Sequence, residues 1–245
     1  MASNLVQENP AKGKKPGGLR SLDILVRHPV FYVVLIVICC LIFGLLAFFI
    51  RKQGALVQWD VAIVNRMHGT ALSSPAWVKG IMLSGYYIGQ HGFILISLLL
   101  ALYFLSKRFW KEFWMVIFTC AGQGPLFLGL SYLFARPRPE FSENIGTVIH
   151  FYGFPSGHMI STVICFGLLA YFFAPILSSA FWKVMVVLTA VMIVVFVGFS
   201  RFFMGAHYLT DVVAGATVGI AWFCLVVLSI EHLSRKGDQK HVKQT

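Results

Sequence analysis

The chain has 245 residues, of which 58% are hydrophobic and only 12% are charged. Soluble domains are about half apolar and about a quarter charged, so this composition excludes an ordinary water-soluble globule and predicts a polytopic membrane protein. The formal net charge of +11 would suggest a nucleic-acid partner in a soluble chain. Here the basic residues gather at the ends of apolar runs, so we expect the bilayer and its anionic headgroups as partners and no nucleic acid.

The first part of the chain predicts one membrane span and one helix on the membrane surface. Residues 1–29 are polar and basic and form a separate N-terminal segment. The apolar run over residues 30–50 is long enough, at about 1.5 Å per residue, to cross the hydrocarbon core, and Arg51 and Lys52 end it. The stretch from there to Lys79 mixes apolar and polar residues, which is typical of an interfacial helix.

Five more apolar runs predict five more spans, which gives six in all. They cover residues 84–106, 113–134, 156–175, 181–199 and 211–230. We expect Gln90 and His91 to face the inside of the bundle, because hydrocarbon penalises polar side chains. The predicted fold is all-α, a six-transmembrane-helix bundle over residues 30–230 with an interfacial helix between spans one and two. A charged tail follows over residues 231–245.

Six spans place both ends of the chain on the same side of the membrane. Lys and Arg number thirteen on that side and seven on the other, so the positive-inside rule predicts cytoplasmic termini. The loops before spans four and six then lie together on the extracytoplasmic face. Short loops and the absence of an Asn-x-Ser/Thr acceptor fit a bacterial inner (plasma) membrane.

The tetrapeptide Pro155-Ser156-Gly157-His158 stands where a polar loop meets span four. If Ser156 caps the helix, its free N–H groups and the helix dipole make this end an anion site. Gly157 would let the anion approach the backbone, and His158 would place a proton donor beside it. The same four residues are also compatible with an ordinary helix cap and an interfacial histidine.

Two more polar clusters are expected on the same face. Arg138 follows span three, and Arg201 precedes span six; two such guanidinium groups can neutralise a phosphate dianion. His207 and Asp211 are four residues apart, so on a helix the carboxylate can fix the imidazole tautomer, and such a histidine can attack phosphorus. Singly, these are compatible with snorkelling arginines and a helix-start pair. Together on one face, they favour a phosphate site.

These residues resemble the signatures of the phosphatidic acid phosphatase type 2 superfamily of integral membrane lipid phosphatases. The second signature of that family, Pro-Ser-Gly-His, matches residues 155–158. The third, Ser-Arg-x5-His-x3-Asp, is present from Ser200 to Asp211 with its spacing intact. The resemblance implies a six-helix core whose active site faces outward, with neither a metal nor a cofactor.

The resemblance also implies a role for each matched residue. His207 corresponds to the nucleophile that forms a phosphohistidine, Asp211 to its orienting partner and His158 to the general acid. The phosphate-binding positions are matched by Arg138, Ser156, Gly157 and Arg201. The implied activity is metal-independent hydrolysis of a phosphomonoester or diphosphate on a lipid headgroup. Only Glu140 and Glu143 place carboxylates close together near the site, which is too few for a two-metal mechanism.

The first signature of the family, Lys-x6-Arg-Pro, is incomplete in this chain. Counting back from Arg138 reaches Ser131, and counting back from Arg136 reaches Gly129, so neither register supplies the lysine. Four residues are candidate auxiliaries for the missing charge: Arg136, Ser131, His91 and His150. The alternative is a catalytically weakened or inactive relative that binds lipid phosphate.

The sequence leaves the lipid open. Prenyl diphosphate, phosphatidylglycerol phosphate, phosphatidic acid and a lipid A phosphate all fit a headgroup site at a membrane surface. A scramblase-like binding module on the same fold is a competing function class, favoured by the missing lysine. A transporter is disfavoured, because the chain has no sign of paired broken helices in two halves. Nothing in the sequence indicates an oligomeric state.

Overall fold

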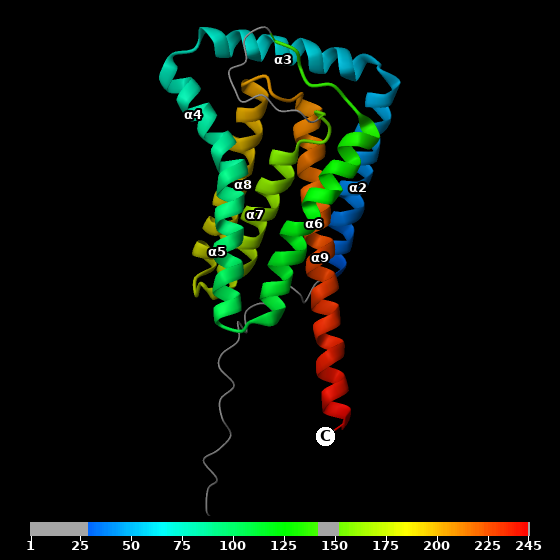
Figure 1. The fold of residues 1–245 in the computed structure, drawn as a ribbon, viewed down its shortest axis with the longest axis vertical. Helices are drawn as coiled ribbons and strands as arrows, with labels where there is room; N and C mark the ends of the chain where they lie inside the picture. The colour runs from blue at the N-terminus through cyan, green and yellow to red at the C-terminus, as the bar shows by residue number, and fades with distance from the viewer. Residues whose placement is uncertain (1–28, 142–151, 245) are drawn as a thin grey trace, which may run out of the picture.

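The computed structural model describes residues 29–141 and 152–244, and within these ranges all regular secondary structure is helical. The predicted N-terminal segment therefore lies almost wholly outside the described residues. The helices, shown in Figure 1, have the following bounds: α2 Pro29–Lys52, α3 Ala55–Ser73, α4 Ala76–Tyr87, the π-helical turn η1 Ile88–Gly92, α5 Phe93–Ser106, α6 Trp110–Phe134, α7 Gly157–Phe173, the 3-10 turn η2 Ala174–Ile176, α8 Ala180–Phe203 and α9 Leu209–Gln244.

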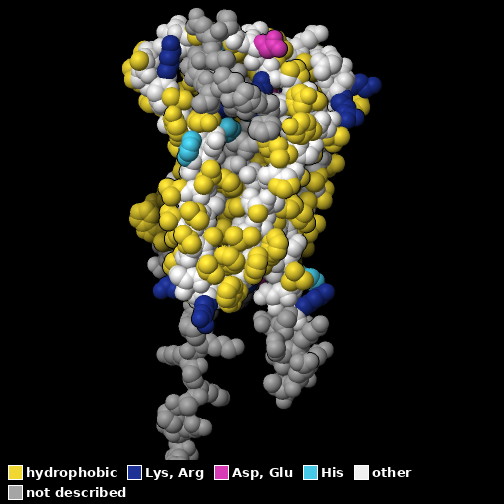
Figure 2. Space-filling view, in the orientation of Figure 1, with side chains coloured by type: hydrophobic (Ala, Val, Ile, Leu, Met, Phe, Trp, Pro, Cys, Tyr) yellow, Lys and Arg dark blue, Asp and Glu magenta, His cyan; other side chains and the backbone are white. Residues whose placement is uncertain are grey.

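The part of the chain that the structure describes contains six helices long and apolar enough to cross a membrane. They are Pro29–Lys52, Ala76–Ser106, Trp110–Phe134, Gly157–Ile176, Ala180–Phe203 and Leu209–Lys236. Figure 2 shows hydrophobic side chains over the middle of the molecule, with Lys and Arg side chains near its two ends. This arrangement suits a bilayer with an apolar core and charged headgroups, and it confirms the predicted six-span, all-α bundle.

Helix α3 lies across one end of the bundle, as Figure 1 shows, and is the interfacial helix that the sequence predicts. Gly54 occupies its N-cap, and Ser74 at its C-cap is extended, as expected for a residue that precedes a proline. Two polar side chains of α3, those of Asp60 and His68, are buried against the bundle. An amphipathic surface helix would keep such groups in water, so α3 makes specific contacts beneath it.

Helix α7 is the central helix of the bundle. In the apolar stretch of this span, 61% of the residues are buried. In the apolar stretch of α8 only 6% are buried, so that stretch faces outward. Helix α9 approaches α7 closely because Gly215 and Gly219 face it: a Cβ on Gly215 would lie 2.5 Å from the Ser156 carbonyl oxygen. Small residues at such crossings let two helices pack backbone against backbone. The start of α7 is thereby fixed against the start of α9.

The second span differs from its prediction in two respects. It begins at Ala76 rather than Ser84, and the Ser84 hydroxyl is satisfied inside the helix by the Ile81 carbonyl at 2.6 Å. Gln90 and His91 are exposed, so the prediction that they face the inside of the bundle is wrong. The physical reason is the π-helical turn η1, which turns Gly89 inward in their place.

The ends of the last two spans also lie beyond their predicted positions. Ser200 and Arg201 belong to the last turn of α8 rather than to a loop, because the Ser200 hydroxyl bonds back to Val197 O at 2.8 Å. Helix α9 does not end at Ile230 but continues to Gln244. Glu231 is buried there, which anchors the helix past the predicted end of the span.

Candidate active site

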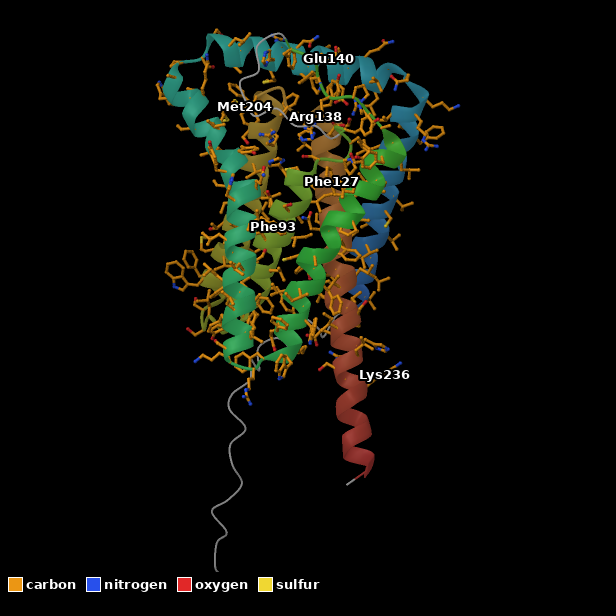
Figure 3. All side chains as sticks on the ribbon, viewed as in Figure 1. Phe93, Phe127, Arg138, Glu140, Met204 and Lys236 are labelled. Atoms are coloured by element: carbon orange, nitrogen blue, oxygen red, sulfur yellow. The ribbon has the colours of Figure 1, made fainter. Side chains whose placement is uncertain are left out.

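Three segments that are distant in the sequence meet beneath α3. They are residues 136–141 after α6, residues 152–158 leading into α7, and residues 200–211 joining α8 to α9. Figure 3 labels Arg138 at this end of the bundle and Lys236 near the opposite end. The loops that the sequence expected on one face are therefore on one face.

His207 is fully buried at the centre of this region, with 0% of its side chain exposed. Its Nδ1 lies 3.0 Å from Gly153 O, whereas the Asp211 carboxylate is 3.7 Å away. With Nδ1–H donated to the Gly153 carbonyl, Nε2 carries the ring's lone pair and accepts from Arg138 Nη1 at 2.8 Å. In this tautomer Nδ1 is closer to the Gly153 carbonyl than to the Asp211 carboxylate, and the orienting role of Asp211 stays a prediction.

The surroundings of His207 also set its charge. Burial is the largest effect, followed by the charges of Arg138 and Arg201, and together they lower the pKa of His207 well below its usual value. The imidazole is therefore neutral at pH 7. A neutral ring with one nitrogen held as a donor and the other presenting its lone pair is suited to act as a nucleophile.

Arg138 connects the loop after α6 to the loop that carries His207. Besides its contact with Nε2, its Nη1 donates to Ala206 O at 2.9 Å, and Nη2 donates to Tyr152 O at 3.4 Å. Burial lowers the pKa of Arg138 to about 10, with the nearby Asp211 acting in the opposite direction. The guanidinium stays charged at neutral pH and faces the lone pair of the candidate nucleophile.

Arg136 is held between two carboxylates. Its Nη1 lies 2.6 Å from Asp211 Oδ1, and its Nη2 lies 2.9 Å from Asp60 Oδ2 on α3. Nη1 also donates to Thr210 Oγ1 at 2.7 Å, and both the backbone N–H and the hydroxyl of Thr210 donate to Asp60. The guanidinium lies over the Tyr208 ring, 4.2 Å from its centroid. These contacts do not favour Arg136 as a free phosphate ligand, because its charge is already matched.

Asp211 fastens the three segments to one another. Its Oδ1 accepts from Arg136, and its Oδ2 accepts from the Tyr208 backbone N–H at 3.0 Å. Its carbonyl oxygen accepts from the Ser156 N–H, also at 3.0 Å. One residue at the start of α9 therefore fixes the loop after α6, the loop of His207 and the start of α7.

The tetrapeptide that opens α7 presents polar atoms that have no partner among the described residues. Ser156 occupies the N-cap, but its side chain makes no capping bond, and its buried Oγ is unsatisfied. The buried Nε2 of His158 also has no partner, and this ring is close enough to Arg201, His207 and Arg138 to feel their charges. Buried polar atoms are nearly always bonded, so two such atoms at one place indicate a binding site.

Gly157 lies against Phe127 of α6. A Cβ at this position would be 3.1 Å from the Phe127 ring, so a larger residue here would have to displace that ring slightly. Gly153 is constrained in the same way, since a Cβ there would lie 3.1 Å from Asp211 Oδ2. The approach of an anion to the backbone of Gly157 stays a prediction.

Arg201 is buried, with 3% of its side chain exposed, and in the described part of the chain no carboxylate pairs with it. Its Nε has no hydrogen-bond partner, and its guanidinium carbon lies 5.1 Å from the centroid of the Tyr86 ring. A buried cation without an anion is costly unless a ligand supplies the opposite charge.

The remaining candidate auxiliaries have varied surroundings. Ser131 is buried in α6, and its Oγ has no partner among the described residues. His91 is exposed, and its ring lies 5.5 Å from that of Tyr87. His150 and Glu143 lie outside the described residues. The parts of Ser131, His91 and His150 in phosphate binding stay predictions.

Comparison with known proteins places this arrangement in a family. The family model for the PAP2 superfamily matches residues 113–235. A phosphatidylglycerophosphatase B of Bacillus subtilis (strain 168) is 31% identical over 157 residues, which is 61% of this chain and 74% of that protein. The chain belongs to the PAP2 superfamily. A crystal structure of a transmembrane PAP2-type phosphatidylglycerolphosphate phosphatase from Bacillus subtilis is similar with a TM-score of 0.68 and 29% identity, covering 82% of this chain and 96% of that one.

Membership of the PAP2 superfamily confirms the resemblance drawn from the two complete signatures. The matched region contains every predicted site residue except His91. Some residues that contact the site lie outside the matched region, among them Asp60 on α3 and Tyr86 on α4.

Sequence reasoning missed four participants. Of these four, only Asp60 stands out in the sequence, because it is a lone carboxylate in the predicted interfacial helix. Thr210 lies inside the third PAP2 signature but at a variable position. Gly153 acts through its backbone carbonyl, and Tyr86 is one of several aromatic residues near a helix end, so neither had a recognisable pattern.

Proposed function

We propose that the protein is a membrane lipid phosphatase that hydrolyses a phosphomonoester or diphosphate on a lipid headgroup through a phosphohistidine at His207. The single observation that carries this proposal is the state of the His207 ring. Nδ1 is fixed by Gly153 O, and the lone pair of Nε2 points at the Arg138 guanidinium. A phosphate oxygen bound by Arg138 brings phosphorus to the side of the ring on which the lone pair lies.

The first chemical step transfers the phosphoryl group to the protein. His207 Nε2 attacks phosphorus, and the bond from phosphorus to the leaving oxygen breaks. The imidazolium form of His158, whose positive charge the bound phosphate dianion stabilises, gives its proton to that oxygen and becomes neutral. The Nδ1 proton stays on the ring, so the phosphorylated imidazole carries a positive charge. The Gly153 carbonyl at 3.0 Å and the Asp211 carboxylate at 3.7 Å stabilise that charge.

The second step restores the protein. Water attacks the phosphohistidine and gives a proton to His158, the bond between Nε2 and phosphorus breaks, and inorganic phosphate leaves. His207 returns to its neutral form, with Nδ1 still donated to Gly153 O. Arg138 and Arg201 neutralise the oxygens of the transferring group in both steps, which supplies electrostatic stabilisation in a site that excludes water.

The proposed reaction uses no metal. Asp60 and Asp211, the buried carboxylates at the described part of the site, both bond to Arg136 and are not turned toward a common ion. The charge that a metal would supply in other phosphatases comes here from two guanidinium groups.

Among the lipid phosphates left open, phosphatidylglycerol phosphate is the first candidate. The support is the name of the relative in Bacillus subtilis, which is a phosphatidylglycerophosphatase. Phosphatidic acid, a prenyl diphosphate and a lipid A phosphate are the other candidates. Each has a charged headgroup for the site and an apolar tail for the bilayer.

We place the site on the extracytoplasmic side of a bacterial inner membrane, with both termini in the cytoplasm. The support is the charge asymmetry of the loops, thirteen basic residues against seven. The site lies under α3, and the C-terminal half of α9 extends from the other end of the bundle, as Figure 1 shows. The site and the C-terminus are therefore on opposite sides of the membrane, whichever way the chain is oriented in it.

A weakened or inactive relative is the second candidate, and the residue that favours it is Ser131. This serine stands where the family lysine is expected, and its buried Oγ cannot replace an ammonium charge. Such a relative would bind lipid phosphate without releasing phosphate.

The experiment for the proposed function measures phosphate release by the purified full chain in detergent from the four lipid phosphates, with and without a chelator. Turnover of at least one lipid that persists in the chelator is the expected result. Strong inhibition by the chelator, reversed by magnesium, would contradict the proposed mechanism. Binding of the lipid phosphates without any turnover would favour the inactive relative.

A further inference from the structure

Helix α4 reaches the active site at a residue that none of the family signatures contains. Gly85 makes this approach possible, because a Cβ there would overlap the Ser200 side chain of α8. The next residue along α4 is Tyr86, and the residue after Ser200 is Arg201. The two helices thus meet where a phosphate-binding arginine is expected.

The Tyr86 ring contacts two site residues at once. Its centroid lies 5.1 Å from Arg201 Cζ and 5.0 Å from the centroid of the His158 ring, with a tilt of 40° between the two rings. Both distances fall in the range of cation–π and aromatic contacts. One side chain therefore borders both the expected phosphate ligand and the expected proton donor.

The kind of contact matters for the charge of Arg201. A carboxylate partner, such as those that hold Arg136, cancels much of the positive charge that an anion would feel. The face of an aromatic ring stabilises a guanidinium and fixes its plane without bringing a negative charge. Arg201 has the ring and, among the described residues, no carboxylate, so its charge stays available.

The backbone just after Tyr86 supports the same arrangement. The π-helical turn Ile88–Gly92 brings Gly89 to Thr162 and His158, where a Cβ would lie 3.1 Å from Thr162 Oγ1 and 3.5 Å from His158 Cδ2. Isolated π-helical turns in α-helices occur frequently at functional sites. Here the turn lets one helix contact His158 at two successive points, Tyr86 and Gly89.

We infer that Tyr86 is a positioning residue of the active site, whose ring holds the Arg201 guanidinium and the His158 imidazole in place for the phosphate while leaving Arg201 fully charged. The inference rests on the proposed function, since it assumes that Arg201 binds the phosphate. The inference assigns this positioning role to the aromatic ring of Tyr86 and not to its hydroxyl group.

The test measures the affinity of the full chain in detergent for inorganic phosphate, from the rise in the thermal midpoint with phosphate concentration. Tyr86→Leu removes the ring, and we expect it to weaken phosphate binding about tenfold. Tyr86→Phe keeps the ring and should bind within about twofold of the parent protein. Tyr87→Leu is the matched control, because Tyr87 is the adjacent exposed tyrosine whose ring faces His91, and it should bind like the parent.

If Tyr86 has a purely structural role, Tyr86→Leu will have a lower thermal midpoint when phosphate is absent, but its affinity for phosphate will be unchanged. That result would overturn the inference. An equal loss in Tyr86→Phe and Tyr86→Leu would also overturn it, since the hydroxyl would then be the acting group. If Tyr86→Leu does not fold, Tyr86→Met makes the same comparison without an aromatic face. A parent protein whose affinity for inorganic phosphate falls in Tyr86→Leu, but which hydrolyses no lipid phosphate, would contradict the proposed function and still support this inference. A parent protein that does not bind inorganic phosphate would overturn the inference.

Discussion

Two clusters of buried polar residues lie at opposite ends of the bundle, and they differ in whether their charges are matched. At the end away from α3, Glu231 accepts from the Tyr171 hydroxyl at 2.9 Å and pairs with Lys111 at 2.6 Å. The Glu231 carboxylate is therefore matched by the Lys111 ammonium group. Beneath α3, the Arg136 guanidinium is matched by two carboxylates, whereas Arg201 has no carboxylate partner in the part of the chain that the structure describes.

The difference shows how a structural cluster can be told from a binding site. A buried polar group without a partner costs about 1–3 kcal/mol, so a fold retains such groups only where something offsets the cost. Within the described residues the α3 end keeps several such atoms, among them Arg201 Nε, His158 Nε2 and Ser156 Oγ. They are donors or potential donors, so an anion is the ligand that satisfies them.

The largest effect is expected from removing the unmatched charge. Arg201→Gln should lower kcat/KM for a lipid phosphate about 1,000-fold, because a guanidinium that stabilises a transferring phosphoryl group is lost. Steady-state phosphate release measures the effect. Arg51→Gln is the matched control, since Arg51 also lies over an aromatic ring, that of Phe134, but is exposed. Equal activity of the two variants would contradict the assignment of Arg201.

Removing the matched charge should affect stability first. Arg136→Met leaves Asp60 and Asp211 buried without their cation, and we expect the free energy of unfolding to fall by about 3–5 kcal/mol. The thermal midpoint in detergent measures this loss, and Arg136→Lys should recover part of it. A variant of normal stability with weakened phosphate binding would instead show that Arg136 is a phosphate ligand.

The pH dependence of stability gives a smaller effect at the same end. The pKa of His207 is lowered in the folded protein, so below about pH 6.5 the unfolded chain takes up a proton at this residue that the folded protein does not. Above that pH this difference in proton uptake does not affect stability. Below it, the difference lowers the free energy of unfolding by at most about 1.4 kcal/mol for each pH unit. Thermal midpoints between pH 7 and pH 5 should fall less steeply in His207→Asn than in the parent. Parallel curves would contradict the buried, neutral state of His207.

The smallest effect is expected at the far cluster. Lys111 is partly exposed, so Glu231→Gln should lower the free energy of unfolding by about 1 kcal/mol. Its kcat should stay within about twofold of the parent, because nothing in that cluster touches the site. A loss of turnover greater than about tenfold would show that the two ends are energetically coupled.

The sequence predicts the parts of this molecule that depend on local patterns. Apolar runs locate the six spans. The spacing of His207 and Asp211 predicts one helical turn, but His207 lies two residues before α9 begins, so here the local pattern gave the wrong backbone although the two side chains are 3.7 Å apart. The helix ends were less predictable. Ser200 and Arg201 looked like a loop because they are polar, yet their side chains point into the protein at the rim of α8.

Long-range contacts could not be predicted in the same way. Asp60 meets Thr210 across 150 residues, and nothing in the interfacial helix specifies that partner. The carbonyl of Gly153 belongs to the backbone, which every residue has, so its bond to His207 leaves no sequence pattern. The exposure of His91 depends on a π-helical turn, which the apolar pattern does not reveal.

The central claim is that His207 Nε2 becomes covalently phosphorylated, and trapping that species tests it most directly. The full chain would be mixed with a lipid phosphate carrying a radioactive phosphorus label, quenched within milliseconds, and digested to locate the label. The account predicts a phosphoryl group that is labile in acid and stable in base, on the peptide that contains His207, and absent from His207→Ala. An acid-stable label on the peptide of Ser156, or full turnover by His207→Ala, would contradict it.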